Sequence, residues 1–460
     1  MTSRWSRLFL SLVLAPLFLL VPSMILTAQG MPLENALAKS ILTHPEIQAK
    51  WHAFRAAIAE QEAATGGFRP RLDLSAGIGR EDLDGAGYEG RDMLGYTRDG
   101  VTLSLNQMLY DGGLTKNQVE KFSHSKKMRY FDVTAAMERV GLDAVRAHED
   151  VVRYRVMSAM ARENLNRHEE VMKKVEDRTK AGVDSKVNLE TAKGRLALAK
   201  VNVLTEESNL HDAVTQYIRV IGETPADSLQ NATVSVTLPV SPEKALEEAF
   251  AGNPQVFASA ESAFAMRSAA SEQKARMKPR LDLRASANFE NDVDGVEGRR
   301  DKTVVELLLR YNLYNGGTDE ATLRRFKELH LESQENLRKV ERDVRQAVLV
   351  AYNDIHAIEK QLPDLEQHRN SADAMRKAYA QQFEVGRRSL LDLLDAENEY
   401  FQANRAYANA EFNLVIARAR YLAATGKLLA TFKISREDVP TLEQMGITPE
   451  IYKAGARGGN

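Results

Sequence analysis

The pattern that decides the fold occurs twice, as RPRLDL at residues 69–74 and as KPRLDL at residues 278–283. Each copy opens a stretch of alternating apolar and polar residues, which closes at LYDGG (109–113) and LYNGG (313–317) respectively. Landmarks of one kind in one order indicate a tandem duplication. The sequence therefore predicts a first repeat at 29–222, a linker at 223–241, a second repeat at 242–430 and a C-terminal tail at 431–460.

Each repeat is expected to contain two β-strands long enough to cross a bilayer. Residues 70–83 and 96–110 alternate in the first repeat, and residues 279–291 and 302–314 in the second. Alternation with period two separates an apolar face from a polar face. A tilted strand of about ten residues spans a bilayer. A soluble sandwich would also alternate, but it would need more than four strands.

Four strands cannot close a barrel alone, and open sheet edges are not tolerated in lipid. Two copies would supply eight strands, whose inward side chains nearly fill the interior, whereas three copies would supply twelve and leave a pore. We therefore predict a homotrimer in which each chain contributes four strands to a shared 12-stranded β-barrel in contact with outer-membrane lipid.

The remainder of each repeat predicts long helical hairpins. Residues 114–181 contain no proline and a single glycine. In the matching segment of the second repeat, apolar residues recur at spacings of three and four, which suits coiled-coil packing. The hairpins turn at AGVDS (181–185) and VGRRS (385–389), where a glycine ends one helix and a serine begins the next. We expect these tips, about 181–187 and 385–391, at the end of the molecule far from the strands.

Composition excludes several function classes. Lys and Arg number 62 against 64 Asp and Glu, so no global basic field is available to hold nucleic acid. The chain has no cysteine, which rules out disulfides, thiolate metal sites and cysteine nucleophiles. Its histidines form no metal-binding spacing. We expect no enzyme activity, no catalytic residues, no metal and no cofactor.

The N-terminus predicts export from the cytoplasm. Arg4 and Arg7 precede an apolar run at 8–26, and small residues follow at Thr27 and Ala28. This order is typical of a secretory signal peptide at 1–28, with a retained membrane anchor as the alternative. The rest of the chain has no apolar stretch of the length of a spanning helix.

Together, the signal peptide, the doubled plan and the tips resemble the TolC family of outer-membrane channels, also called outer membrane factors. The second tip, VGRRSLLDLLDAE at 385–397, is similar to that of members serving type I secretion. The resemblance implies a mostly α fold with a membrane β part, in which three copies form a periplasmic α-barrel. It also implies partners: a periplasmic adaptor (membrane fusion protein) and an inner-membrane transporter of the ABC type.

The resemblance further implies roles for the tip residues. The adaptor would dock on the two tips, at Gly182, Val183, Ser185, Gly386, Arg387, Ser389 and Leu390. Asp392 and Asp395 would form acidic rings at a periplasmic gate, and Arg388 would help to hold it closed. The family often has an acidic residue at the position of Asn188. The sequence therefore departs here from the family's pattern for an ionic latch at the gate. The alternative for the two aspartates is a first-turn acid pair stabilised by the helix dipole.

The preferred function is a trimeric outer-membrane channel-tunnel, reaching into the periplasm, that exports proteins by type I secretion. One alternative is the outer-membrane component of a multidrug or metal efflux pump. An alternative of another class is a secreted coiled-coil scaffold or a periplasmic adaptor. The four long strands discriminate against a scaffold, which has no need of them. The Asp-Gly sequences at 82–85 and 292–295 have two interpretations, a weak cation site or ordinary hairpin turns, which favour the same residues.

Overall fold

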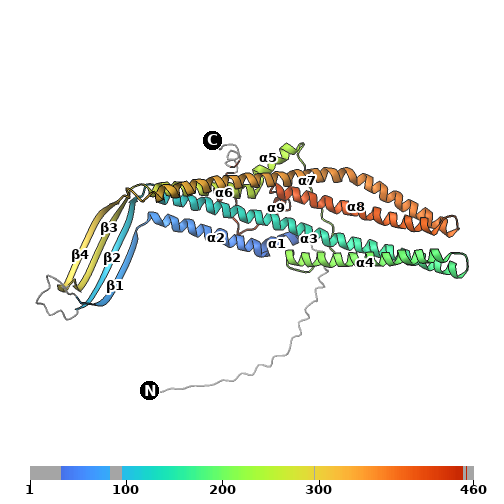
Figure 1. The fold of residues 1–460 in the computed structure, drawn as a ribbon, viewed down its shortest axis with the longest axis horizontal. Helices are drawn as coiled ribbons and strands as arrows, with labels where there is room; N and C mark the ends of the chain where they lie inside the picture. The colour runs from blue at the N-terminus through green and yellow to red at the C-terminus, as the bar shows by residue number, and fades with distance from the viewer. Residues whose placement is uncertain (1–32, 83–95, 295, 449–451, 453–460) are drawn as a thin grey trace, which may run out of the picture.

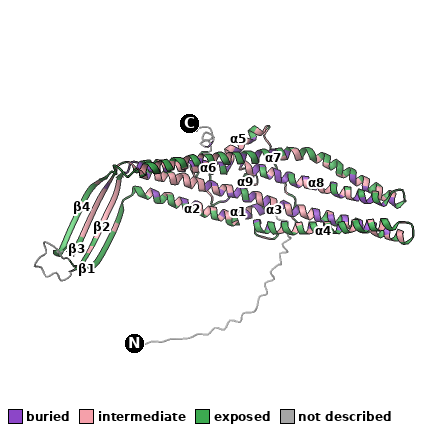
Figure 2. Cartoon of the chain, in the orientation of Figure 1, coloured by how far each residue is buried: buried purple, intermediate pink, exposed green. Residues whose placement is uncertain are grey.

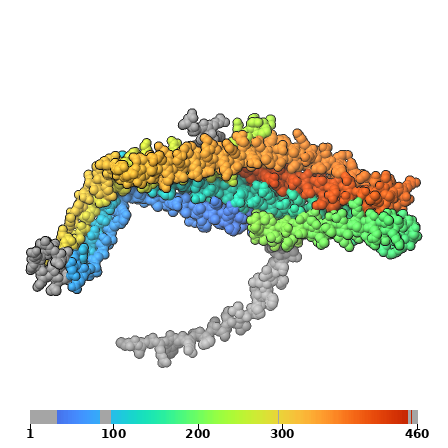
Figure 3. All heavy atoms as spheres, in the orientation of Figure 1, coloured from blue at the N-terminus to red at the C-terminus, as the bar shows by residue number. Residues whose placement is uncertain are grey.

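The computed structural model describes residues 33–82, 96–294, 296–448 and 452. The predicted signal peptide and most of the first Asp-Gly turn lie outside these residues. The described chain is an elongated body of helices with a four-stranded sheet at one end (Figure 1). Figure 3 shows the same elongated outline in all atoms, with the two helical tips at the end opposite the sheet.

Two helices of 67 residues each form the long axis, α3 (Leu114–Lys180) and α7 (Thr318–Glu384). At 1.5 Å per residue each is about 100 Å long. Both start at the sheet, after a glycine with positive φ, and run to the tips (Figure 1). The returning helices are α4 (Lys186–Ile221) and α8 (Leu390–Ala424), which pack on α3 and α7 respectively.

The remaining helices lie nearer the sheet. α2 (Pro45–Thr65) packs on α3, and α6 (Pro254–Arg276) packs between α3 and α7. The short helices are α1 (Leu33–Thr43), the 3-10 turn η1 (Gly66–Phe68), α5 (Pro242–Gly252) and α9 (Leu428–Thr431). No helix within the described ranges is both long and apolar enough to cross a membrane.

The linker and the tail are packed segments. His148 and Glu149 of α3 hydrogen-bond the linker backbone, at Gln230 O and Ala232 N, both at 2.9 Å. At the other end of the linker, the Tyr352 hydroxyl of α7 donates to Pro239 O at 3.1 Å. Apolar residues of the tail join the core formed by α2, α3 and α6. The described part of the tail therefore belongs to the folded body.

The sheet is antiparallel throughout, in the order β1 (Arg71–Glu81), β2 (Tyr96–Tyr110), β3 (Arg280–Val293) and β4 (Val296–Arg310). Its register aligns apolar residues across all four strands, as in the row Leu72, Leu105, Ala285 and Val305. The next row, on the other face, is Asp73, Ser104, Ser286 and Val304. The sheet thus has one apolar face and one largely polar face.

The apolar face is uncovered in a single chain, and much of the sheet is exposed in Figure 2. Leu74 and Ile78 of β1 are 71% and 80% exposed, and Val305 and Leu307 of β4 are 68% and 65% exposed. Within the described residues, the outer edges of β1 and β4 have no strand partner. In the described part of a single chain, the apolar face therefore has no covering layer and the two edges have unpaired backbone groups.

The fourth strand differs from its predicted bounds of 302–314. It begins at Val296, directly after a tight turn in which Asp292 and Asp294 have positive φ, and it ends at Arg310. The charged residues Arg299, Arg300 and Asp301 hide this start from a pattern search, yet their backbone pairs with β3. Backbone N–H and C=O groups are enough for strand pairing, so apolar side chains are not required at the rim.

Candidate docking and gating site at the helical tips

The two tips share one backbone geometry. In the first, Gly182 has φ +73°, and the N–H of Val183 donates to Arg178 O at 2.9 Å. In the second, Gly386 has φ +74°, and the N–H of Arg387 donates to Gln382 O at 2.8 Å. This is the glycine-terminated helix end in which a left-handed residue lets the chain close on the last free carbonyls.

Serine side chains start both returning helices. The Ser185 hydroxyl accepts the N–H of Asn188 at 3.1 Å, and the Ser389 hydroxyl accepts that of Asp392 at 3.1 Å. Asp392 also accepts from Ser389 N and Oγ, which completes a capping box on α8. These caps make the tips short and defined rather than extended loops.

Most of the predicted docking residues are exposed, and one is not. Val183 lies beside Gly182 and is exposed, as are Arg387 and Ser389 at the second tip. Leu390 is only 2% exposed and packs in an apolar cluster with Phe383, Leu393 and Leu394. A partner cannot contact this side chain while the cluster is intact. The neighbouring Leu391 is 54% exposed and takes its place on the surface.

The predicted gate residues do not form one network: Arg388 and Asp392 interact with each other within the second tip, and Asp395 has a different partner. Arg388 Nη1 lies 3.7 Å from Asp392 Oδ2, and its guanidinium also covers the ring of Tyr379. Hydrogen bonds from Ser389, with Arg388 nearby, hold the pKa of Asp392 below its usual range. Asp392 therefore stabilises the first turn of α8, the role expected as the alternative to gating. A residue at the tip can serve both roles, so the gating role stays a prediction.

Asp395 has a partner that the sequence analysis missed. Arg195 of α4 donates from Nη2 to Asp395 Oδ1 of α8 at 2.8 Å. Arg195 lies seven residues after Asn188 and therefore on the same face of α4. This heptad spacing is the sequence signal that could have identified Arg195 as a gate residue. Asn188 itself donates to Asp184 Oδ1 at 2.5 Å and stays within its own tip.

Further contacts join the first hairpin to the second. Arg178 pairs with Asp184 at 3.4 Å, and its guanidinium lies 5.3 Å from the Phe383 ring centroid of α7. Lys174 of α3 pairs with Glu384 of α7 at 2.9 Å. The apolar cluster around Leu390 includes Val171 and Val175 of α3. The tips of one chain are thus held together by an apolar centre and exposed charges.

Within the described ranges, His, Asp and Glu form no group of three or more that could hold a metal ion. The tip residues are charged and apolar groups on helix ends, suited to contacts with other helices.

The fold is similar to that of solved outer-membrane channels. The CmeC outer membrane channel of Campylobacter jejuni matches with a TM-score of 0.75 at 14% identity, over 92% of this chain and 89% of that one. The model of the outer membrane efflux protein family matches residues 36–223 and 245–427. The chain belongs to this family, whose members are transport proteins, and it is an outer-membrane protein.

Two curated relatives agree with this assignment. The outer membrane efflux protein BepC of Brucella suis is 25% identical over 447 residues, which cover 94% of this chain and 92% of BepC. The outer membrane protein TolC of Escherichia coli is 24% identical over 267 residues, which cover 55% of this chain and 54% of TolC. The predicted TolC-like family, mostly helical fold and outer-membrane location are confirmed, and the scaffold alternative is set aside.

Proposed function

We propose that three copies of this chain form one outer-membrane export channel. The observation that carries the proposal is the sheet, whose apolar face is exposed and whose outer edges, on β1 and β4, meet no further strand in the described part of the chain. In lipid, unpaired backbone groups are costly. Pairing β4 of one copy with β1 of the next satisfies both edges, and three copies give a barrel of about twelve strands with a lumen.

In such a trimer the apolar face contacts outer-membrane lipid and the polar face lines the lumen. The helical bodies lie side by side as a second, α-helical barrel in the periplasm, and the tips meet at its far end. Asp392 and Asp395 would then lie near the axis, and Arg195, Arg388 and the apolar cluster would hold the tips closed.

The tips are the proposed docking surface for a periplasmic adaptor. The surface consists of Gly182, Val183, Ser185, Gly386, Arg387, Ser389 and Leu391. Glycines without side chains and exposed apolar neighbours allow another helix to approach the backbone closely. Through this adaptor the channel would join an inner-membrane transporter.

For the transported material we propose proteins, delivered by an ABC transporter in type I secretion. The support is the tip sequence VGRRSLLDLLDAE at 385–397, which resembles that of secretion channels. Efflux of small molecules is the second candidate, favoured by the name of the relative BepC, which matches nearly the whole chain. Comparing a deletion strain with its parent separates them. Loss of a large secreted protein supports secretion, and drug sensitivity alone supports efflux.

Disulfide crosslinking tests the trimer directly, because the chain has no cysteine of its own. Ser75→Cys in β1 is combined with a cysteine at position 300, 302 or 304 in β4, all on the polar face. Oxidation should give a covalent trimer for at least one pair. Ser75→Cys with Thr102→Cys, which are opposite each other within one chain, is the matched control and should give monomers only. Monomers from every β1–β4 pair would refute the shared sheet.

A further inference from the structure

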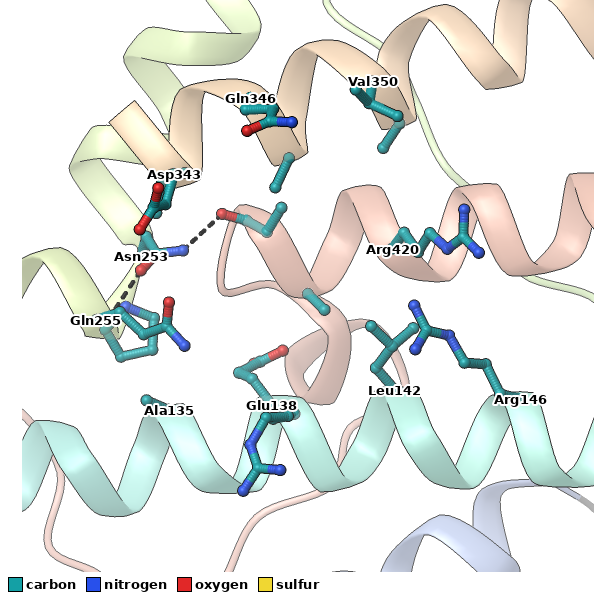
Figure 4. Close-up of a pocket in the computed structure, with 17 residues that line it drawn as sticks. Ala135, Glu138, Leu142, Arg146, Asn253, Gln255, Asp343, Gln346, Val350 and Arg420 are labelled. Atoms are coloured by element: carbon teal, nitrogen blue, oxygen red, sulfur yellow. Dashed lines mark hydrogen bonds between the residues drawn. The ribbon is translucent and has the colours of Figure 1, made fainter. Parts of the chain in front are cut away.

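A cavity of about 610 Å³ lies in the helical wall, between α3 and α7 and near the middle of their length (Figure 4). It occurs where α8 ends at Ala424 and α6 begins at Pro254. Asn253 links the two helix ends: its Nδ2 donates to Ala424 O at 2.8 Å, and its Oδ1 accepts Gln255 N at 2.8 Å. Two helix ends meeting in place of one continuous helix leave room beside them.

The walls of this cavity are mainly apolar. They are formed by Leu142 of α3, Val344, Ala347, Val350 and Ala351 of α7, and Ala423 of α8. Its volume is within the range of sites that hold small organic ligands. The cavity is therefore large and apolar enough to hold a short hydrocarbon body.

One end of the cavity is positively charged. Arg146 of α3 and Arg420 of α8, both partly exposed, line this end from opposite sides (Figure 4). Each forms a long ion pair on its flank, Arg146 with Asp143 at 3.7 Å and Arg420 with Asp354 at 3.9 Å, and Asp150 also acts on Arg146. Both distances are longer than a hydrogen bond. Arg146 Nε is buried without a hydrogen-bond partner in the described chain. Burial and the neighbouring Arg420 also lower the pKa of Arg146.

The other charged groups of the lining do not neutralise this pair. Glu138 accepts the N–H groups of Leu428 and Leu429 at 3.1 and 3.4 Å, and Arg139 forms an ion pair with Glu46 of α2. Asp343 lies at the opposite end of the cavity, beside Asn253 (Figure 4). The two guanidinium groups keep donors available for a ligand.

The cavity opens away from α5 and the linker. Arg345 and Tyr352 of α7, seven residues apart, contact Phe250 of α5 and Pro239 of the linker. The cavity residues Ala347 and Val350 lie on another face of this helix, given 3.6 residues per turn. Neither α5 nor the linker covers the cavity on that side.

We propose that this cavity binds an amphipathic organic anion, whose carboxylate or phosphate head bridges Arg146 and Arg420 and whose apolar chain lies along α7. Two guanidinium groups that line one end of a cavity repel each other, and an anionic head between them removes the repulsion and adds charge-assisted hydrogen bonds. The cavity is built from the helices of one chain, so the proposal does not rest on the proposed trimer or on the exported material.

Equilibrium dialysis of radiolabelled dodecanoate against the full-length protein in a non-ionic detergent tests the site. We expect saturable binding that Arg146→Gln and Arg420→Gln each weaken by about tenfold or more. Ala347→Phe, which fills the cavity with both arginines in place, should also abolish it. Arg418→Gln is the matched control, because Arg418 is on the same helix, pairs with Glu359 at 2.8 Å and lies outside the cavity lining.

Thermal melting of each variant shows that its fold is retained, and dodecanol measures the need for the charged head. Binding of dodecanoate that is absent, or equally strong in both glutamine variants, would overturn the proposal. Binding of inorganic phosphate as tight as that of dodecanoate would also overturn it, since the apolar walls would contribute nothing. Native mass spectrometry from nanodiscs containing phosphatidylglycerol identifies the source. Lipid retained by the parent and lost in Arg420→Gln indicates a membrane lipid, and dodecanoate binding without retained lipid indicates a free amphiphile.

Discussion

Arg195 on α4 and Asp395 on α8 form an ion pair at 2.8 Å that connects the two hairpin tips of one chain. The pair is partly exposed, with 32% and 58% of the two side chains accessible, so solvent screens it. The buried cluster around Leu390 supplies the larger part of the attraction between the tips. If the tips form the proposed gate, this pair would be a weak latch at its surface.

Replacing Arg195 by glutamine should make opening easier. An exposed ion pair contributes about 0.2–1 kcal/mol, which corresponds to an increase of up to about fivefold in the open-to-closed ratio. Single-channel recordings in planar bilayers measure this ratio. Lys193→Gln, which removes a pair with Glu190 within α4, is the control and should change nothing. Exchanging the charges, as Arg195→Asp with Asp395→Arg, should restore closure. An unaltered ratio in Arg195→Gln would show that this pair is no latch.

Neutralising both acids of the proposed gate should reduce its preference for cations. Three copies of Asp392 and Asp395 would place six carboxylates around one axis, and rings of acidic side chains select cations. We expect Asp392→Asn with Asp395→Asn to lower cation selectivity and block by trivalent cations from the periplasmic side. Asparagine keeps an acceptor oxygen at position 392 for the backbone N–H of Ser389, so the capping box can persist. Asp212→Asn, an exposed change at the other end of α4, is the control. Undiminished block in the double variant would leave both aspartates as capping and pairing residues alone.

A bulky residue at Gly386 should prevent docking while the trimer still assembles. A Cβ at Gly386 meets no atom within 4 Å, but φ is +74°, so every side chain brings backbone strain of about 1 kcal/mol. Gly386→Ala isolates this strain and should retain most export. Gly386→Trp adds bulk on the docking surface and should abolish export, as measured by secreted protein or drug tolerance. Normal export by the tryptophan variant would remove this tip from the docking role.

The stability of the helical body should fall as pH rises through the titration of Glu138. Burial raises the pKa of Glu138 from 4.5 to about 7, although it accepts two backbone N–H groups. The folded state therefore holds a proton that the unfolded state releases, and stability is lost between pH 4.5 and 7. The full shift corresponds to about 3 kcal/mol. Glu138→Gln should melt at a temperature less dependent on pH, and the exposed Glu169→Gln of the same helix should not.

Local patterns predicted the elements of this fold well. The RPRLDL and KPRLDL repeats lead into β1 and β3, and the glycines at 182 and 386 end the long helices as expected. Period-two alternation and helix-end chemistry act between neighbours in the chain, so they can be recognised without a structure. The early start of β4 was missed because charged residues at its rim interrupt the alternation.

The amino-acid sequence by itself determined the duplication, the four strands, the long hairpins and the family resemblance. Only the tertiary structure decided that Leu390 is buried, that Asp395 pairs with Arg195, and that Arg146 and Arg420 line one apolar cavity. These pairings join residues from different helices and depend on how each helix is rotated about its axis. That rotation is set by packing of the whole body, and no local spacing encodes it.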